Sequence, residues 1–152
     1  DHRDLHYPLR RQRQMCIRDS TLGVDNAING NSDAMVSWNW KANGAGSSNS
    51  DGSLSSTVSV NQTAGFSIVT YTGSSSASTV GHGLTALPKM IITKTRASGY
   101  ESPVYHNAMG NEKHLLLDTN GAMGDGEYWN DTTPTSSVFS LGGQKINVNY
   151  IF

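Results

Sequence analysis

With 152 residues and a single cysteine, the chain is long enough to bury a core and has no disulfide framework. No run approaches the roughly 18 apolar residues of a membrane span, and no window keeps the i, i+3, i+4, i+7 apolar spacing of an amphipathic helix. The low apolar fraction of 36%, combined with many Gly, Ser, Thr and Asn residues, predicts short strands joined by turns.

Residues 1–20 differ in composition from the rest of the chain. They hold five of the eleven Lys and Arg residues and the only cysteine, Cys16. Taken as protein, they would be a basic tail for nucleic acid or an acidic surface. The string RRQRQMCIRDS at residues 10–20 resembles translated sequencing-adapter read-through, which implies a disordered tail that is not native. Without residues 1–20 the net charge is −3, from six basic and nine acidic residues, which argues against a nucleic-acid partner.

Residues 21–41 are predicted to be the last strand of a preceding module. Alternation over residues 35–40 places Val36, Trp38 and Trp40 on one strand face. Two short strings recur about 119 residues later: TLG at residue 21 as SLG at residue 140, and INGN at residue 28 as INVN at residue 146. Chance recurrence is the alternative. The match predicts a tandem array of modules, with this chain cut from it at both ends.

Residues 42–64 are rich in Ser, Gly and Asn and have little to bury. The string NSDG at residues 49–52 signals a turn, and Leu54, Thr57, Val58 and Val60 could form an edge strand. The segment is predicted to be an intermodule linker that pairs loosely in its C-terminal half. A flexible linker without any strand is the alternative.

Residues 65–152 are predicted to form the β-module itself. Runs of β-branched and aromatic residues bounded by Gly, Ser or Pro predict strands. The expected strands cover residues 66–72, 79–80, 89–95, 104–106, 114–117, 128–130 and 138–139, with residues 150–152 as an incomplete closing strand. One core between two sheets is expected from Phe66, Ile68, Ile91, Leu115, Leu117, Val138 and Phe139.

His82 is the first candidate for chemistry. It lies between Gly81 and Gly83, a pattern that predicts a positive φ or a close approach of the backbone. A metal ligand or a general base is the functional interpretation. Because no second ligand stands at a suitable spacing, a loop histidine bonded to the backbone is favoured.

The loop at residues 118–130, DTNGAMGDGEYWN, is the second candidate. It begins like an EF-hand loop but has Ala122, Met123 and Trp129 where a ligand, Gly and Glu are required. An irregular cation site made by the carboxylates of this loop is an alternative. A glycan platform, in which exposed aromatic rings stack on a sugar, would use Tyr128, Trp129, Asn130 and Asp131. The competing interpretation packs the aromatic of a YWN strand into the core.

Several strings together resemble a known module. The order GFSIVTYTG, VGHGL, PKMIITK, VYHNAMGN, HLLLDT and YWNDTTPTSSVFSLG resembles a module of unknown function repeated in tail-fibre and other structural proteins of marine bacteriophages, often beside laminin-G or concanavalin-like domains. The resemblance covers residues 65–142, and WNWK at residues 38–41 resembles a join between modules. It implies a non-enzymatic virion part that acts in host attachment, without catalytic residues, cofactor or metal. The expected partners are neighbouring modules of the same fibre.

The expected fold is thus an all-β, antiparallel sandwich of jelly-roll-like type. A structural or adhesive module is the favoured function, and a lectin-like module that binds a host-surface glycan is the alternative. Neither a nucleic-acid nor a membrane partner is expected, and the oligomeric state is left open. A glycosidase would need two carboxylates roughly 5–10 Å apart, whereas the acids here lie in polar turns.

Overall fold

The computed structural model describes residues 30–34, 37, 39–96, 99–143 and 150–151. The chain divides into two compact units, Asp1–Asn39 and Trp40–Phe152. In the first unit a turn is described, in which the Asp33 amide donates to the Gly30 carbonyl at 3.3 Å. The predicted tail at residues 1–20 lies outside the described residues. So do Val36 and Trp38 of the strand predicted over residues 35–40, and nearly all of the recurring strings at residues 21–31.

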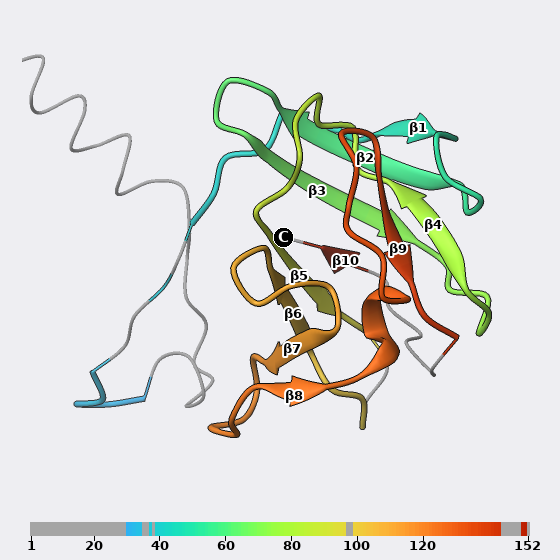
Figure 1. Ribbon diagram of the computed structural model, residues 1–152. Coiled ribbons are helices and arrows are strands. Elements are labelled where there is room, and N and C mark those ends of the chain that lie inside the picture. The colour runs from blue at the N-terminus through green and yellow to red at the C-terminus, as the bar shows by residue number, and fades with distance from the viewer. Residues whose placement is uncertain (1–29, 35–36, 38, 97–98, 144–149, 152) are drawn as a thin grey trace, which may run out of the picture. The chain divides into compact units, whose positions relative to one another are not determined.

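The described part of the second unit is built from strands and one short 3₁₀ helix (Figure 1). In chain order the elements are β1 (Ser47–Asn49), β2 (Ser56–Asn61), β3 (Phe66–Tyr71), β4 (Ser78–Gly81), β5 (Met90–Lys94), β6 (Pro103–His106), β7 (Lys113–Leu116), β8 (Gly124–Asp125), η1 (Glu127–Trp129), β9 (Val138–Leu141) and β10 (Tyr150–Ile151). No described helix is long and apolar enough to span a bilayer.

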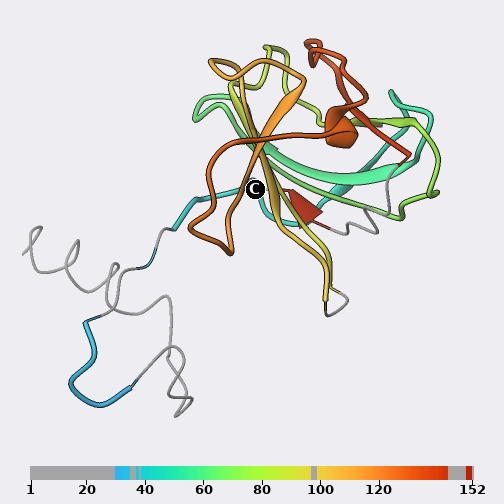
Figure 2. The same ribbon diagram turned by 60° about the horizontal axis from the view of Figure 1, so that its bottom comes forward.

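The strands form two sheets that pack face to face. One is an open sheet in the order β1-β2-β3-β10-β5-β6-β7-β8, and the other is the pair β4-β9. All their strand pairs are antiparallel. Buried residues of β2, β3, β5 and β6 share one core cluster with those of β4, β9 and η1. Figure 2 shows the η1 coil on the same side of β2 and β3 as β9. The expected all-β antiparallel sandwich is confirmed.

The Ser-rich segment at residues 42–64 contributes two strands to the large sheet. β2 pairs with β3 along its full length and with β1 on its other side, so it is not an edge strand. The two buried serines of β2 are tolerated there because each hydroxyl finds a backbone partner. Ser56 Oγ donates to the Gly81 carbonyl at 3.0 Å, and Ser59 Oγ donates to the Gly44 carbonyl at 2.8 Å. Val58, 4% exposed, supplies the apolar contact.

The core uses the opposite face of β3 from the one predicted. Val69 and Tyr71 are buried in the cluster, whereas Phe66 and Ile68 are only half-buried. The prediction for Phe66 and Ile68 was therefore wrong. Ser67 can occupy the inner face because its hydroxyl donates to the His82 carbonyl at 2.6 Å, which removes the cost of burying it unpaired.

The other predicted core residues are buried in two cases, exposed in two and half-buried in one. Ile91 and Phe139 are 2% and 1% exposed, as expected. Leu115 and Leu117 are exposed, so their assignment to the core was wrong, and Val138 is half-buried. The leucine pair belongs to the β7 end of the sheet, where His114 takes the buried position of the strand. Alternation along a strand then turns Leu115 outward.

The predicted strand at residues 128–130 is also wrong. Glu127–Trp129 form η1, which ends where Asn130 and Asp131 adopt left-handed φ values of 50° and 46°. Asn and Asp tolerate this conformation better than most residues, so the pair reverses the chain after a single turn. η1 is held against β9 by the Gly142 amide, which donates to the Tyr128 carbonyl at 2.9 Å.

Candidate functional site: an apolar pocket at the end of the sandwich

The predicted glycan platform does not present its tryptophan to solvent. Trp129 is 1% exposed and packs edge-on against Tyr105, with ring centroids 5.7 Å apart. It has the core position that the competing interpretation gave it. Asn130 and Asp131 are exposed in the turn after η1, where the Asp131 backbone carbonyl accepts a hydrogen bond from Nδ2 of the Asn111 side chain. These four neighbours in sequence therefore do not form one stacking surface.

Tyr128 is the remaining aromatic of that string and is half-buried. Its hydroxyl donates to a Glu101 carboxylate oxygen, and its ring meets His114 edge-on at 4.4 Å between centroids. Burial, the hydrogen bond and the negative charge of Glu101 together raise the pKa of Tyr128 to about 12. The phenol is thus kept protonated and occupied by a protein partner, which leaves it little freedom to bind a ligand.

The carboxylates of the 118–130 loop do not gather into a metal site. The described residues contain no group of three or more His, Cys, Asp or Glu side chains with the geometry to hold an ion. Asp125 instead pairs with Lys113 at 2.6 Å on neighbouring strands β7 and β8, and Asp118 accepts from the Ser102 amide at 3.4 Å. Structural pairing thus occupies two of the acids in the predicted cation loop.

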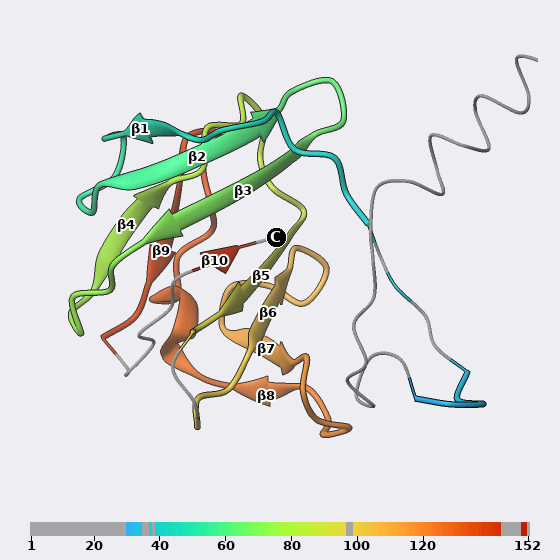
Figure 3. The same ribbon diagram turned by 180° about the vertical axis from the view of Figure 1, so that it is seen from behind.

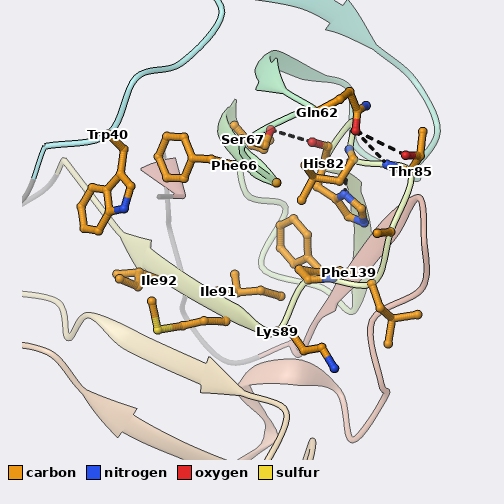
Figure 4. A pocket seen from close by; sticks show the side chains of 17 residues that line it. Trp40, Gln62, Phe66, Ser67, His82, Thr85, Lys89, Ile91, Ile92 and Phe139 are labelled. Atoms are coloured by element: carbon orange, nitrogen blue, oxygen red, sulfur yellow. Dashed lines mark hydrogen bonds between the residues drawn. The ribbon is translucent and has the colours of Figure 1, made fainter.

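A pocket of about 440 Å³ opens at one end of the sandwich (Figure 4). Its walls come from the start of β3, the loop at residues 82–89 and the start of β5, with the core residue Phe139 among the side chains that line it. Lys89 is the charged side chain among the described lining residues, apart from the titratable His82. The remaining walls are mostly aliphatic or aromatic, which suits an apolar occupant.

Three exposed apolar side chains belong to this pocket. Trp40, Leu87 and Met90 are 50%, 49% and 48% exposed. Trp40 stacks on Phe66, with ring centroids 5.7 Å apart and planes at 14°, so two aromatic rings stand together at the mouth. Large apolar groups clustered in this way mark a binding surface more often than a solvated one.

The 82–89 loop is held by hydrogen bonds to Gln62, the residue just after β2, and to Ser67 of β3. Gln62 Nε2 donates to the Gly83 carbonyl at 2.6 Å, and Gln62 Oε1 accepts from the Thr85 amide at 3.3 Å (Figure 4). Gly83 has a φ of +71°, and a Cβ there would lie 2.7 Å from Val58 Cγ1. The predicted need for glycine beside His82 is therefore confirmed.

His82 is a structural residue of this loop. Its Nδ1 accepts from the Leu84 amide at 3.1 Å, and its Nε2 lies 3.2 Å from the Thr135 carbonyl, where a neutral ring can donate. The favoured interpretation of a loop histidine bonded to the backbone is confirmed. Desolvation by burial lowers the pKa of His82, and the Thr135 hydrogen bond and the Asp51 charge oppose it more weakly.

This pKa shift predicts how stability depends on pH. Because the folded chain resists protonation at His82 and the unfolded chain does not, the free energy of unfolding should fall as the pH drops below about 6.5, the ordinary pKa of histidine. This loss of stability reaches its full size once the pH is below the lowered pKa of His82 in the folded chain. Urea unfolding of the wild type and of His82→Gln between pH 5 and 7.5 measures it. The His82→Gln protein should lack this part of the pH dependence of the unfolding free energy. An equal pH dependence in both proteins would contradict the assignment of the effect to His82.

The comparison with protein families gives a clear result. Residues 16–151 match the family described as Domain of unknown function (DUF7483). The chain belongs to the DUF7483 family. No curated protein and no solved structure matches it. The DUF7483 match extends from Cys16 across both units to Ile151 and therefore includes residues 42–64 with the strands of the sandwich.

The pocket of this DUF7483 domain could be recognised only in part from its sequence. The GHGLTALP loop stands out by its glycines, and the structure makes it one wall. The contribution of Trp40 was missed because alternation had assigned it to a strand, and that of Leu87 because a lone leucine in a loop carries no signal. Only the approach of β3, β5 and this loop brings the three exposed side chains to one place.

Proposed function

We propose that this DUF7483 domain is a non-enzymatic structural or adhesive module, and that it contacts a neighbouring module through the apolar pocket. The observation that carries the proposal is the cluster of Trp40, Leu87 and Met90 around a pocket with mostly apolar walls. Such a surface gives contact area and excludes water, as the centre of a protein interface does. Its one histidine is already engaged with backbone groups.

The proposed setting is a tail fibre or related surface part of a bacteriophage, where the module acts in host attachment outside the cell. The support is the resemblance of residues 65–142 to a module of marine phage structural proteins, together with an all-β fold of short strands. The genes beside the one that encodes this chain test the setting. Neighbours that encode other virion parts are expected, whereas a metabolic operon would contradict it.

The contact itself is tested by joining two copies of the full chain with a Gly/Ser linker. If modules pack through the pocket, the tandem protein should melt several degrees above the single chain, since a neighbour that binds the folded state stabilises it. Met90→Asp in both copies should abolish this gain. Met123→Asp is the matched control, because Met123 is 50% exposed and lies outside the pocket residues. An unchanged melting temperature in the tandem, or equal effects of the two substitutions, would contradict the proposal.

A lectin-like module is the second candidate, and one observation favours it. The Trp40 indole is half-exposed while it stacks on Phe66, so it can offer a face to a sugar ring. Glycan-array binding that is lost in Trp40→Ala, with the melting temperature retained, would support this function. Binding that survives the substitution would exclude this ring as the glycan platform.

A further inference from the structure

A second cavity, of about 450 Å³, lies over β1, β2 and β3, the three strands that Figure 3 shows side by side. Its volume is in the roughly 300–1,000 Å³ range of small-molecule sites. Seven of its lining residues carry a hydroxyl group and the eighth carries a guanidinium: Ser48, Ser55, Ser56, Thr57, Thr70, Tyr71, Thr72 and Arg96. The cavity therefore differs in chemistry from the apolar pocket, with which it shares no residue.

The strand register places three of the hydroxyl residues in one row. Ser48 of β1 is opposite Thr57 of β2, and Thr57 is opposite Thr70 of β3. Residues that are directly opposite one another share a face of the sheet. Val58 and Val69, the chain neighbours of Thr57 and Thr70, are 4% and 0% exposed in the core. Since successive side chains alternate between faces, the row lies on the outer face of the large sheet.

Three more lining residues are exposed beside this row. Ser55 and Thr72 each stand two positions along the chain from a member of the row. Arg96 stands two positions after Lys94, the last residue of β5, and both side chains are exposed. We call the outward set the hydroxyl site: Ser48, Ser55, Thr57, Thr70, Thr72 and Arg96.

The five hydroxyl groups of this site have no hydrogen-bond partner among the residues that the structure describes. Buried serines of the same strands differ, because Ser56 Oγ donates to the Gly81 carbonyl and Ser67 Oγ to the His82 carbonyl. Water can satisfy a single exposed hydroxyl anywhere on a surface. Five of them gathered in one cavity offer an outside molecule a dense set of donors and acceptors, since each hydroxyl can donate once and accept twice.

Arg96 supplies the positive charge of the hydroxyl site. Its guanidinium has five N–H donors in a planar fork that matches two oxygens of a carboxylate or sulfate group. With five donors it can bind such a group and keep a contact within the protein as well. The lining residues of this cavity include no Asp or Glu, so no carboxylate of the lining repels an anion there.

We propose that the hydroxyl site binds a sugar that carries an oxyanion, either a carboxylate or a sulfate ester. Arg96 binds the oxyanion, and the Ser and Thr hydroxyls exchange hydrogen bonds with the hydroxyls of the sugar ring. A protein partner fits this site less well, because the centre of a protein interface is rich in apolar and aromatic side chains. The inference goes beyond the proposed module contact and uses none of the residues of the apolar pocket.

The test titrates the full chain with single sugars and follows its amide and arginine side-chain signals by NMR. The charged probes are glucuronic acid and galactose 6-sulfate, which distinguish the carboxylate from the sulfate ester. Glucose and galactose are the neutral counterparts, and inorganic sulfate is the anion without a sugar. At least one charged sugar should give saturable shifts at Ser48, Thr57, Thr70 and Arg96. It should bind about tenfold or more tightly than its neutral counterpart and than inorganic sulfate.

Three outcomes of this titration would overturn the proposal. The first is the absence of saturable shifts at these residues with either charged sugar. The second is equal binding of a charged sugar and its neutral counterpart, which would remove the role of the oxyanion. The third is binding of inorganic sulfate as tight as that of the charged sugars, which would mean an adventitious ion only.

Arg96→Gln tests the charge of the site. Binding of the charged sugar should weaken about tenfold or more, because the paired hydrogen bonds to the oxyanion are lost. Lys94→Gln is the matched control, since it removes the same charge from an exposed residue outside the lining. It should change the affinity less than about twofold, because salt screens exposed charges. Equal effects of the two substitutions would leave only general attraction by positive charge and overturn the site.

Thr57→Val tests the row of hydroxyls and does not depend on how Arg96→Gln folds. It removes one outward hydroxyl, keeps the shape of the side chain and suits a strand, so the melting temperature should be retained. Binding of the charged sugar should weaken severalfold. Thr63→Val is the matched control, because Thr63 is exposed and lies outside the cavity. Unchanged affinity in the Thr57→Val protein, or equal effects of both substitutions, would overturn the role of the row.

Discussion

Replacement of Phe139 by alanine should lower the free energy of unfolding by about 3–5 kcal/mol. Phe139 is 1% exposed on β9, meets the Tyr71 ring of β3 edge-on at 6.2 Å between centroids, and lines the pocket. It therefore joins the two sheets, and its removal leaves a cavity between them. Urea unfolding followed by circular dichroism measures the change.

Leu117→Ala is the control for this prediction. Leu117 was expected in the same core but is 59% exposed, so its truncation should change stability by less than about 1 kcal/mol. A small effect of Phe139→Ala would mean that the two sheets do not share the packing described above. A large effect of Leu117→Ala would mean that the β7 end is covered in solution.

Trp129→Ala should also cost about 3–5 kcal/mol, because a fully buried indole is removed from its contact with Tyr105. Its indole Nε1 has no hydrogen-bond partner among the described residues, so the substitution leaves no partner group unpaired. The loss should thus come from apolar packing, offset in part because a buried N–H without a partner is also removed. Thermal or urea unfolding measures it on the same scale as Phe139→Ala.

Trp40→Ala is the matched tryptophan substitution. Trp40 is half-exposed and loses mainly its stack on Phe66, which is worth about 1 kcal/mol. The two tryptophan substitutions should therefore affect different properties, stability in one case and binding in the other. Trp129→Ala should unfold the chain more easily, and Trp40→Ala should weaken contact at the pocket. A stable Trp129→Ala protein that has lost glycan binding would instead restore the platform predicted from the sequence.

The strands were predictable where local chemistry agrees with the fold. The runs that became β3, β5, β6, β7 and β9 are short, rich in β-branched or aromatic residues, and bounded by turn formers, so their existence follows from the sequence. β1 and β8 were not foreseen because SSN and GD carry no strand preference. Their positions depend on pairing with β2 and β7.

The faces of the strands were harder to predict, since β3 carries apolar residues on both. Alternation offers Phe66 and Ile68 on one side against Val69 and Tyr71 on the other, and nothing local decides between them. Which face of β3 is buried depends on Ser67, because its hydroxyl finds its hydrogen-bond partner only when the loop that carries His82 folds over it. That contact joins residues 15 positions apart and leaves no pattern in the sequence.

The candidate site shows the same limit. In the YWN string a buried and an exposed tryptophan look alike, and the burial of Trp129 depends on Tyr105 of β6. His82 was easier, because the absence of nearby ligand residues already favoured a structural role. The pocket itself needs β3, β5 and the 82–89 loop together, so no single stretch of sequence predicts it.

The place of β10 in the large sheet has a consequence for folding. β1–β3 and β5–β8 are two separate antiparallel ribbons. Among the described strands, β10 alone joins them edge to edge within the sheet, and it follows both ribbons in chain order. During synthesis on the ribosome both ribbons emerge before the strand that unites them. Until β10 is synthesised, each ribbon exposes an unpaired strand edge, and such edges are prone to aggregation. The long-range pairing that closes the sheet should be a slow step of folding.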